Sequence, residues 1–301
     1  MNFDTAFHTY ETFIDRITAI CSQYPWIGYE NLGKSFLGRD IPLIRLGNGS
    51  QKILYVGAHH GCEWITAELL LQFLWEYADC FERRQRTCNI DVSYLHHTRT
   101  IFIIPMLNPD GAALSLSGAE AGNPLASRLI HMNGGSEDFS TWKANGRGVD
   151  LNRNYNAGFS YCMKFSADNG LLGGAPRYFC GQYPESEPET AALCRWIRSK
   201  APLQLLLSLH TAGEEIYWDY GGKADYRTKT VASILARLSG YRLAEPDAGA
   251  AHGGLKDWYL MNYSGPALTV ECGMGESPLP RSSLPSMYTH IRPMLFQGAL
   301  L

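Results

Sequence analysis

Short apolar runs alternate with helical patterns along this chain, and this alternation restricts its fold more than any other feature. Strands are predicted at residues 26–32, 41–46, 52–56, 98–105, 203–209 and 267–271. Helices are predicted at residues 3–22, 62–78, 186–200, 229–238 and 254–261, and at the C-terminal end. Strands that alternate with helices in this way predict an α/β fold, with helices on both faces of a central sheet.

Local motifs predict where some of these elements begin and end. Ser186 and Glu189 have the spacing of a capping box at the start of a helix. Residues 108–111 (NPDG) predict a turn after an apolar strand. Residues 117–183 are rich in Gly, Asn and Ser, so we expect mainly long loops there, and loops of that length are usually functional.

Composition excludes several classes of protein. With 301 residues, 45% of them hydrophobic, the chain can bury a large core. Its net charge of −3 lacks the basic excess of a nucleic-acid-binding protein. No apolar run is long enough to span a bilayer, and the first residues lack the features of a secretory signal, so we expect a cytoplasmic protein. The oligomeric state is left open.

Three residues that can bind a metal or transfer a proton stand at or just beyond the ends of predicted strands. They are His60, His210 and Glu271. In open α/β sheets, ligands bind at the carboxyl ends of the strands. We therefore expect the functional site at that edge of the sheet.

A candidate metal site begins with His60 and Glu63, which are three residues apart, so that one helical turn can place both on one side. Zinc binds imidazole nitrogen and carboxylate oxygen, and a catalytic zinc site typically has three protein ligands. His210, at the end of a buried strand, is the best candidate for the third. An His-x-x-Glu pair alone is common, however, and a packed or surface histidine is the usual explanation.

Four motifs strengthen the metal-site interpretation, because they occur in the order seen in one enzyme family. They are HGCEW (60–64), GVDLNRN (148–154), SLHT (208–211) and TVE (269–271). With them, the chain resembles the zinc carboxypeptidases of the carboxypeptidase A type from about residue 27 to the last strand. The resemblance implies a three-layer α/β/α sandwich with a mixed, largely parallel central sheet. We expect one catalytic domain over residues 1–301, with no room for a LysM or other accessory domain.

The resemblance implies a role for each matching residue. His60, Glu63 and His210 would bind one zinc ion, and Asp150 would orient His60. Glu271 would act as general base and acid, because it could take a proton from a metal-activated water and pass it to the leaving amine.

A second group of residues would hold the substrate. By the same resemblance, Asn152 and Arg153 would bind a substrate carboxylate. Lys143 stands where digestive members carry an oxyanion-binding Arg, and Arg147 could share that role. Those members also carry a mobile Tyr before a Gly-Gly pair, whereas residues 247–252 (DAGAAH) contain none.

Further motifs resemble one bacterial branch of this family. The segments WKAN (142–145), PESEPE (184–189), GEEIYW (213–218) and GGLKDW (253–258) resemble γ-D-glutamyl-(L)-meso-diaminopimelate peptidases, which cut the stem peptides of peptidoglycan. Such a substrate carries several carboxylates, and it would suit a site lined by Lys143, Arg147, Arg153 and Lys256. Lys256 falls in the specificity region, although a solvated helix residue is an equally good interpretation. We therefore expect a peptide substrate from the bacterial wall.

Other interpretations stay open at this point. The same zinc site would serve an ordinary carboxypeptidase that removes C-terminal residues, or an amide hydrolase of small acylated amino acids. An inactive peptide-binding protein is the non-enzyme alternative, against which the retained ligands and Glu271 argue. Residues 28–35 (GYENLGKS) match a phosphate-binding loop, but Ser35 is followed by turn residues instead of the helix that such a loop needs.

Overall fold

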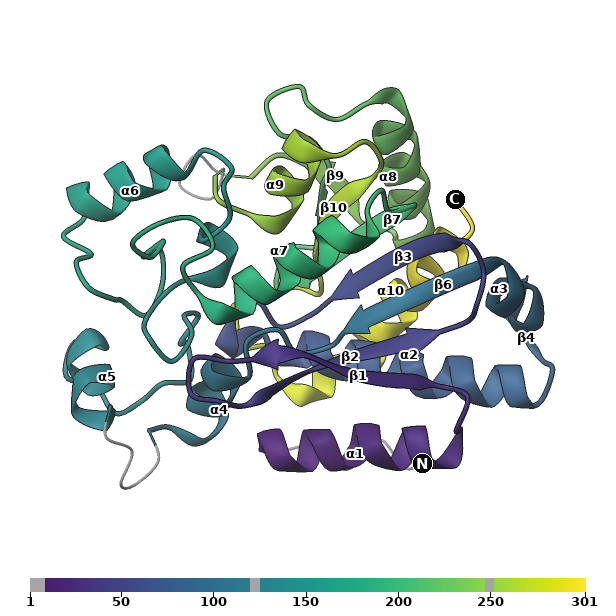
Figure 1. Cartoon of the computed structure of the whole chain (residues 1–301), viewed down its shortest axis with the longest axis horizontal. Helices are drawn as coiled ribbons and strands as arrows, with labels where there is room; N and C mark the ends of the chain where they lie inside the picture. The colour runs from purple at the N-terminus through teal and green to yellow at the C-terminus, as the bar shows by residue number, and fades with distance from the viewer. Residues whose placement is uncertain (1–8, 120–124, 247–251) are drawn as a thin grey trace.

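A mixed sheet lies between two layers of helices in the computed structural model, which describes residues 9–119, 125–246 and 252–301 (Figure 1). Its eight described strands are, in spatial order, β1 (Gly28–Lys34), β2 (Asp40–Leu46), β6 (Arg99–Ile104), β3 (Gln51–Val56), β7 (Leu205–His210), β10 (Ala267–Glu271), β8 (Glu215–Tyr217) and β9 (Arg242–Ala244). The three-layer α/β/α sandwich expected from the sequence is confirmed.

The central strands of the sheet run parallel, which agrees with their composition. β6, β3, β7 and β10 are neighbours in that order, and each pair is parallel. Strands covered on both faces are almost continuously apolar, and all six residues of β7 (LLLSLH) are buried. β1, β2 and β8 pair antiparallel towards the edges, so the sheet is mixed but parallel at its centre.

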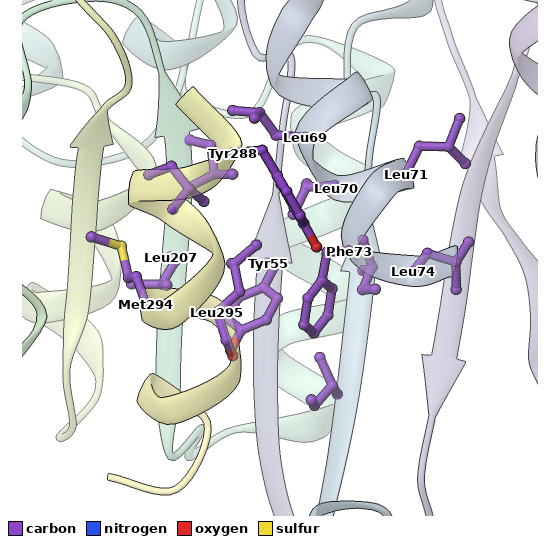
Figure 2. Close-up of a cluster of buried hydrophobic side chains, with 14 of the residues drawn as sticks. Tyr55, Leu69, Leu70, Leu71, Phe73, Leu74, Leu207, Tyr288, Met294 and Leu295 are labelled. Carbon is purple, nitrogen blue, oxygen red and sulfur yellow. The ribbon is translucent and has the colours of Figure 1, made fainter. Parts of the chain in front are cut away.

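One face of the sheet is covered by α1 (Tyr10–Gln23), α2 (Ile65–Glu82), α8 (Tyr226–Ser239) and α10 (Leu284–Gly298). Figure 2 shows the middle of this layer, where Tyr55 of β3 and Leu207 of β7 lie among side chains of α2 and α10. The Tyr55 hydroxyl donates to the Leu295 carbonyl at 2.7 Å, so this polar group is satisfied within the apolar core.

The opposite face is covered by α7 (Pro188–Lys200), which crosses in front of the sheet in Figure 1, and by α9 (Leu255–Asn262). Leu193 and Ile197 are one helical turn apart on α7 and pack in the same apolar cluster as Leu206 of β7. α9 packs on β7 and β10, and its Tyr259 hydroxyl accepts from the Leu203 N–H at 2.7 Å just before β7 begins.

The predicted capping box at Ser186 is wrong, because both of its side chains bond to other partners. The N-cap position of α7 is occupied by Glu187, whose side chain makes no capping bond, and the Ser186 hydroxyl donates to the Glu187 carboxylate at 2.8 Å. The Glu189 carboxylate accepts from the Phe36 N–H at 2.9 Å, on a distant loop. Local spacing predicted the helix but could not reveal these tertiary bonds.

Segments predicted as turns or loops contain further elements. Residues 108–111 open α4 (Pro109–Ser117), where the Asn108 side chain accepts from the Gly111 N–H at 2.9 Å as a helix cap. The segment 117–183 contains α5 (Ala126–Met132) and α6 (Phe159–Asp168), which lie at the lower left and upper left of Figure 1. Other elements that were not predicted include β4 (Arg86–Thr87), β5 (Ile90–Asp91), α3 (Val92–Thr98) and the edge strands β8 and β9.

Two expectations concern the start of the first helix and the possibility of a membrane-spanning helix. The first helix was expected to begin at residue 3, but residues 3–8 lie outside the described part of the chain. Within the described ranges, none of the helices combines the length and apolar character that crossing a bilayer requires.

Candidate active site

The turn that carries His60 and Glu63 is positioned by close backbone packing. It follows β3, and its 3-10 helix η1 (Gly61–Glu63) lies against α4. A Cβ atom at Gly61 would lie 2.3 Å from the Gly111 carbonyl oxygen, so only glycine permits this approach. The Gly61 N–H donates to the Lys143 carbonyl at 3.0 Å, which ties the turn to the segment that carries Lys143.

Three side chains that can bind a metal meet at the carboxyl end of the sheet. His60 Nδ1 lies 2.9 Å from Glu63 Oε1, and His210 Nδ1 lies 3.0 Å from Glu63 Oε2. The two Nδ1 atoms are 3.3 Å apart. Among the described residues, these three form the one group of His, Cys, Asp or Glu side chains close enough to share a metal ion.

The geometry of this group fits zinc. Ligand bonds of roughly 2.1 Å in a tetrahedral site place ligand atoms roughly 3.4 Å apart, close to the observed separations of 2.9, 3.0 and 3.3 Å. The far nitrogens are also held, because His60 Nε2 lies 3.1 Å from Asp150 Oδ1 and His210 Nε2 lies 3.0 Å from Ser208 Oγ. Such bonds direct each Nδ1 lone pair towards the metal position, so Asp150 lies where its expected orienting role requires.

A chain of hydrogen bonds continues from His210 into the core. Ser208 Oγ also lies 3.2 Å from His59 Nδ1, and His59 Nε2 lies 3.0 Å from the Tyr155 hydroxyl. The His59 and His210 rings stack with their centroids 5.2 Å apart. All four side chains are buried, so this series of hydrogen bonds restrains the orientation of the His210 ring on the side away from the metal position.

Glu271 lies beside His210 because their strands pair in register. In the parallel ladder of β7 and β10, the two residues are direct partners at the ends of their strands. Glu271 lines the same cavity as the three ligands, with a volume of about 150 Å³. Burial, together with the neighbouring Glu63 carboxylate, raises the pKa of Glu271 to about 8. A cation held by the ligands would lower that pKa and favour the carboxylate, which can accept a proton.

Lys143 and Arg147, the two candidates for binding an oxyanion, lie in different surroundings. Lys143 Nζ donates to Glu63 Oε1 at 2.8 Å and lines the cavity. The Arg147 guanidinium instead lies 4.4 Å from the centroid of the Phe36 ring, and its Nε is 3.4 Å from a Glu187 oxygen. This placement contradicts the expectation that Arg147 shares the oxyanion role, because its side chain is committed to a neighbouring loop.

Asn152 and Arg153 both line the cavity, where a carboxylate-binding pair is expected. They belong to the 3-10 helix η2 (Leu151–Arg153), and the Asn152 side-chain oxygen accepts from the Leu255 N–H at 3.1 Å. The Arg153 guanidinium lies 5.3 Å from the centroid of the Tyr178 ring. A guanidinium that packs on an aromatic ring and faces a cavity can bind a carboxylate through two parallel hydrogen bonds.

Lys256 is a buried residue of the cavity wall. It is only 3% exposed, and its Nζ donates to the Asp219 carbonyl at 2.6 Å and to the Asp257 carboxylate. The interpretation of Lys256 as a solvated helix residue is therefore wrong. Because Lys256 and Asp257 both line the cavity, its wall carries a positive and a negative charge side by side.

These residues and their geometry agree with a comparison of the whole sequence. The profile of the zinc carboxypeptidases, peptidase family M14, matches residues 12–287. This chain belongs to the zinc carboxypeptidase family. It is therefore a metallopeptidase, a hydrolase of peptide or amide bonds, and its His60, Glu63 and His210 form the candidate zinc site.

Known proteins similar to this zinc carboxypeptidase include a relative with a named activity. The γ-D-glutamyl-L-diamino acid endopeptidase 1 of Lysinibacillus sphaericus is 32% identical over 295 residues, which cover 98% of this chain and 72% of that protein. Among solved structures, thrombin-activatable fibrinolysis inhibitor has a TM-score of 0.74 at 17% identity, covering 98% of this chain and 74% of that chain. Murein-tripeptide amidase MpaA from Escherichia coli O157 has a TM-score of 0.57 at 21% identity, covering 90% and 92%. These two structures show the shared fold.

Several site residues of this zinc carboxypeptidase escaped the sequence analysis. Ser208 could have been found, because side chains alternate along a strand and Ser208 therefore shares a face with His210. The Tyr178 N–H donates to Asp150 Oδ2 at 3.1 Å, but Tyr178 comes from an irregular loop that no local pattern marks. Residues 247–251, where the family's mobile Tyr is missing from the sequence, lie outside the described residues.

Proposed function

We propose that this zinc carboxypeptidase hydrolyses the amide bond between γ-D-glutamate and meso-diaminopimelate in peptidoglycan stem peptides, with one zinc ion per chain. The buried pair of Lys256 and Asp257 in the cavity wall carries this proposal. The distal end of diaminopimelate has an ammonium and a carboxylate on one carbon, so it can bond to both charges. An aliphatic or aromatic side chain would leave these charges without a new partner as water is displaced.

The similarity to the Lysinibacillus sphaericus protein supports the same class of substrate. That protein is named a γ-D-glutamyl-L-diamino acid endopeptidase, and the similarity extends over 98% of this chain. The positive charges of Lys143 and Arg153 in the cavity also favour a substrate with several carboxylates.

The cavity residues have the chemistry that amide hydrolysis requires. A zinc ion bound by His60, Glu63 and His210 would polarise the scissile carbonyl and lower the pKa of an attacking water towards about 7. Glu271 would accept the proton of that water and then donate it to the leaving amine.

The cations of the cavity would bind charge on the substrate. Lys143 would donate a hydrogen bond to the oxyanion from its position beside Glu63. Arg153 and Asn152 would hold a carboxylate of the diamino acid, which positions the scissile bond relative to Glu271.

The test compares a diamino acid with an apolar analogue at the same position. Zinc-loaded protein is incubated with L-Ala-γ-D-Glu-meso-diaminopimelate and with the same peptide ending in L-norleucine, and products are followed by mass spectrometry. We expect kcat/KM to favour diaminopimelate by at least about 100-fold, because a site built for polar groups rejects an analogue that lacks them. Lys256→Gln should remove most of that preference, whereas Lys34→Gln, at an exposed ion-paired lysine, should keep it.

Two further substrates in the same assay, an ordinary C-terminal peptide and a small acylated amino acid, distinguish the alternatives. Cleavage of ordinary C-terminal peptides but not of the diaminopimelate peptide would establish a conventional carboxypeptidase. Cleavage of small acylated amino acids alone would establish a deacylase. Binding without turnover, identical for wild type and Glu271→Gln, would establish a peptide-binding protein.

A further inference from the structure

The segment that carries Lys143 lies directly against the turn that carries two of the metal ligands. The Gly61 N–H donates to the Lys143 carbonyl at 3.0 Å, and the Cys62 N–H donates to the Trp142 carbonyl at 2.8 Å. Both donors belong to η1, the 3-10 helix of that turn. The position of the Lys143 backbone relative to the metal ligands is therefore set at the junction of these two segments.

The side chain of Asn108 joins the two segments at this junction. Its Nδ2 lies 3.0 Å from the His59 carbonyl oxygen, 3.3 Å from that of Lys143 and 3.1 Å from that of Ala144. Its Oδ1 accepts from the Gly111 N–H at 2.9 Å. Asn108 is fully buried, so bulk water cannot take the place of its N–H groups.

Close backbone packing leaves little room for another arrangement around Asn108. A Cβ atom at Gly111 would lie 2.3 Å from the Ala144 carbonyl oxygen and 2.5 Å from Asn108 Nδ2. The Asn108 N–H donates to the Ala58 carbonyl at 3.0 Å, just beyond β3. The Asn108 backbone is thus held against the end of β3, and its amide is held between α4 and the Lys143 segment.

Lys143 depends on such a restraint because its own side chain is a flexible four-carbon stem. Its Nζ donates to Glu63 Oε1 at 2.8 Å, beside the metal position. A donor to an oxyanion has to lie within about 3 Å of the atom on which the charge develops. A shift of about 1 Å can cost about 100-fold in rate. The backbone from which Lys143 extends must therefore keep its distance from the metal ligands.

We infer that Asn108 is a positioning residue for hydrolysis: its amide fixes the Lys143 backbone relative to the metal ligands and so keeps Lys143 Nζ where it can donate to the oxyanion. The cap that Asn108 provides for α4 is a separate role, carried by Oδ1. The inference rests on the role of Lys143 in the proposed function. It does not depend on the proposed substrate, because an oxyanion forms in the hydrolysis of any amide.

Two substitutions separate the positioning role from the cap. Asn108→Ser and Asn108→Asp both keep an oxygen that can cap α4, because Ser and Asp are about as good as Asn at that position. Both lose the amide N–H groups that bond to the three carbonyls. Since only one of the two variants adds a carboxylate, an effect that both share reports the lost donors.

A double-mutant cycle with Lys143→Met tests whether Asn108 acts through Lys143. With zinc-loaded protein and L-Ala-γ-D-Glu-meso-diaminopimelate, each Asn108 variant should lower kcat by about ten-fold and change KM by less than about two-fold. In the Lys143→Met background, the same substitution should lower kcat by less than about two-fold, because the group that Asn108 positions is already gone. The Kd of zinc should stay within about three-fold, because Asp150 and Ser208 still bond to the ligand histidines.

Amide hydrogen exchange of the metal-free protein gives a second readout, without turnover. The Gly61 and Cys62 N–H groups should exchange faster in both Asn108 variants than in the wild type. The reason is that the carbonyl groups that accept from them are then less restrained.

Asn154→Asp is the matched control. Asn154 is also fully buried, and its Nδ2 lies 2.7 Å from the Cys180 carbonyl oxygen and 3.2 Å from that of Tyr183. This variant should lower the urea midpoint about as much as Asn108→Asp. Its effect on kcat should be the same factor with and without Lys143→Met, and hydrogen exchange in η1 should stay unchanged.

Three results would overturn the inference. The first is an equal factor of loss in kcat for the Asn108 variants in the wild-type and Lys143→Met backgrounds, since Asn108 would then act on stability alone. The second is unchanged hydrogen exchange at Gly61 and Cys62. The third is an unchanged kcat in Lys143→Met, which would refute the oxyanion role of Lys143 as well.

Failure of this inference is distinguishable from failure of the proposed function. Hydrolysis of the diaminopimelate peptide, with no loss of kcat in the Asn108 variants, refutes the inference and leaves the proposed substrate standing. Hydrolysis of another amide instead refutes the proposed substrate, and the cycle measured on that amide then decides the inference. No hydrolysis of any amide by the wild type refutes both.

Discussion

Replacing His59 by Phe tests the hydrogen-bond chain behind His210. The new ring can still stack on His210, but it cannot bond to Ser208 or Tyr155. The buried Tyr155 hydroxyl loses its partner, which costs about 1–3 kcal/mol, and Ser208 loses one of its two bonds, worth about 1 kcal/mol. We therefore expect the free energy of unfolding to fall by about 2–4 kcal/mol in urea titrations of the metal-free protein.

The same substitution should also weaken the binding of zinc. Loss of a hydrogen bond behind a ligand lowers metal affinity by about 10–100-fold. We expect a value near 10-fold for His59→Phe, because Ser208 still bonds to His210 directly. Competition with a chelating dye measures the Kd of zinc independently of activity.

His96→Phe is the matched control, because His96 is a buried histidine away from the site. Its ring stacks on Phe81 with centroids 3.8 Å apart, and its Nδ1 has no hydrogen-bond partner within the described residues. Removing this unpaired nitrogen should leave the stability unchanged or slightly higher, with zinc affinity unchanged. If His59→Phe behaved like His96→Phe in both measurements, the hydrogen bonds from His210 to Tyr155 would contribute neither to stability nor to zinc affinity, and the reasoning would be refuted.

Further predictions concern catalysis, pH and the metal. Glu271→Gln should lower kcat by about 10²–10⁴-fold without loss of zinc, measured by kinetics and metal analysis. Lys143→Met should lower kcat by about 100-fold, whereas Arg147→Met should change it less than about three-fold; equal losses would contradict the assignment. Burial raises the pKa of Glu189 from 4.5 to about 8, so as the pH rises the unfolded state loses this proton before the folded state does. The contribution of Glu189 to the free energy of unfolding is therefore complete below about pH 4.5 and lost by about pH 8. In Glu189→Gln, the urea concentration at the unfolding midpoint should depend less on pH over that range. Chelation should lower Tm, and zinc should restore it where magnesium does not.

The positions of His60, His210 and Glu271 could be predicted because these residues stand at or just beyond the ends of strands with a strong apolar pattern. β7 and β10 are short apolar runs whose ends align in a parallel pair, so His210 and Glu271 had to meet if the strands were neighbours. The pair His60 and Glu63 was local in sequence. The motif order then supplied what the spacing alone could not, namely which histidine completes the set.

Side-chain directions within irregular segments could not be predicted. Lys143 and Arg147 are four residues apart in a loop, and only the tertiary structure shows that one faces Glu63 and the other faces Phe36. The burial of Lys256 depends on the Asp219 carbonyl, which comes from a distant segment. The helices α5 and α6 were missed because Gly, Asn and Ser dominate their surroundings and conceal the helical period.

The register of β7 and β10 has a consequence for how this enzyme should respond to heat. His210 and Glu271 are paired residues of two neighbouring strands in the inner part of the sheet. The Cys272 N–H, one residue after Glu271, donates to the His210 carbonyl at 2.7 Å. Regions with a dense hydrogen-bonded core open last on warming, whereas peripheral segments such as α6 open first. His210 and Glu271 thus lie in the part of the fold that is expected to open last. On heating, these two residues should therefore keep their places until the sheet itself opens.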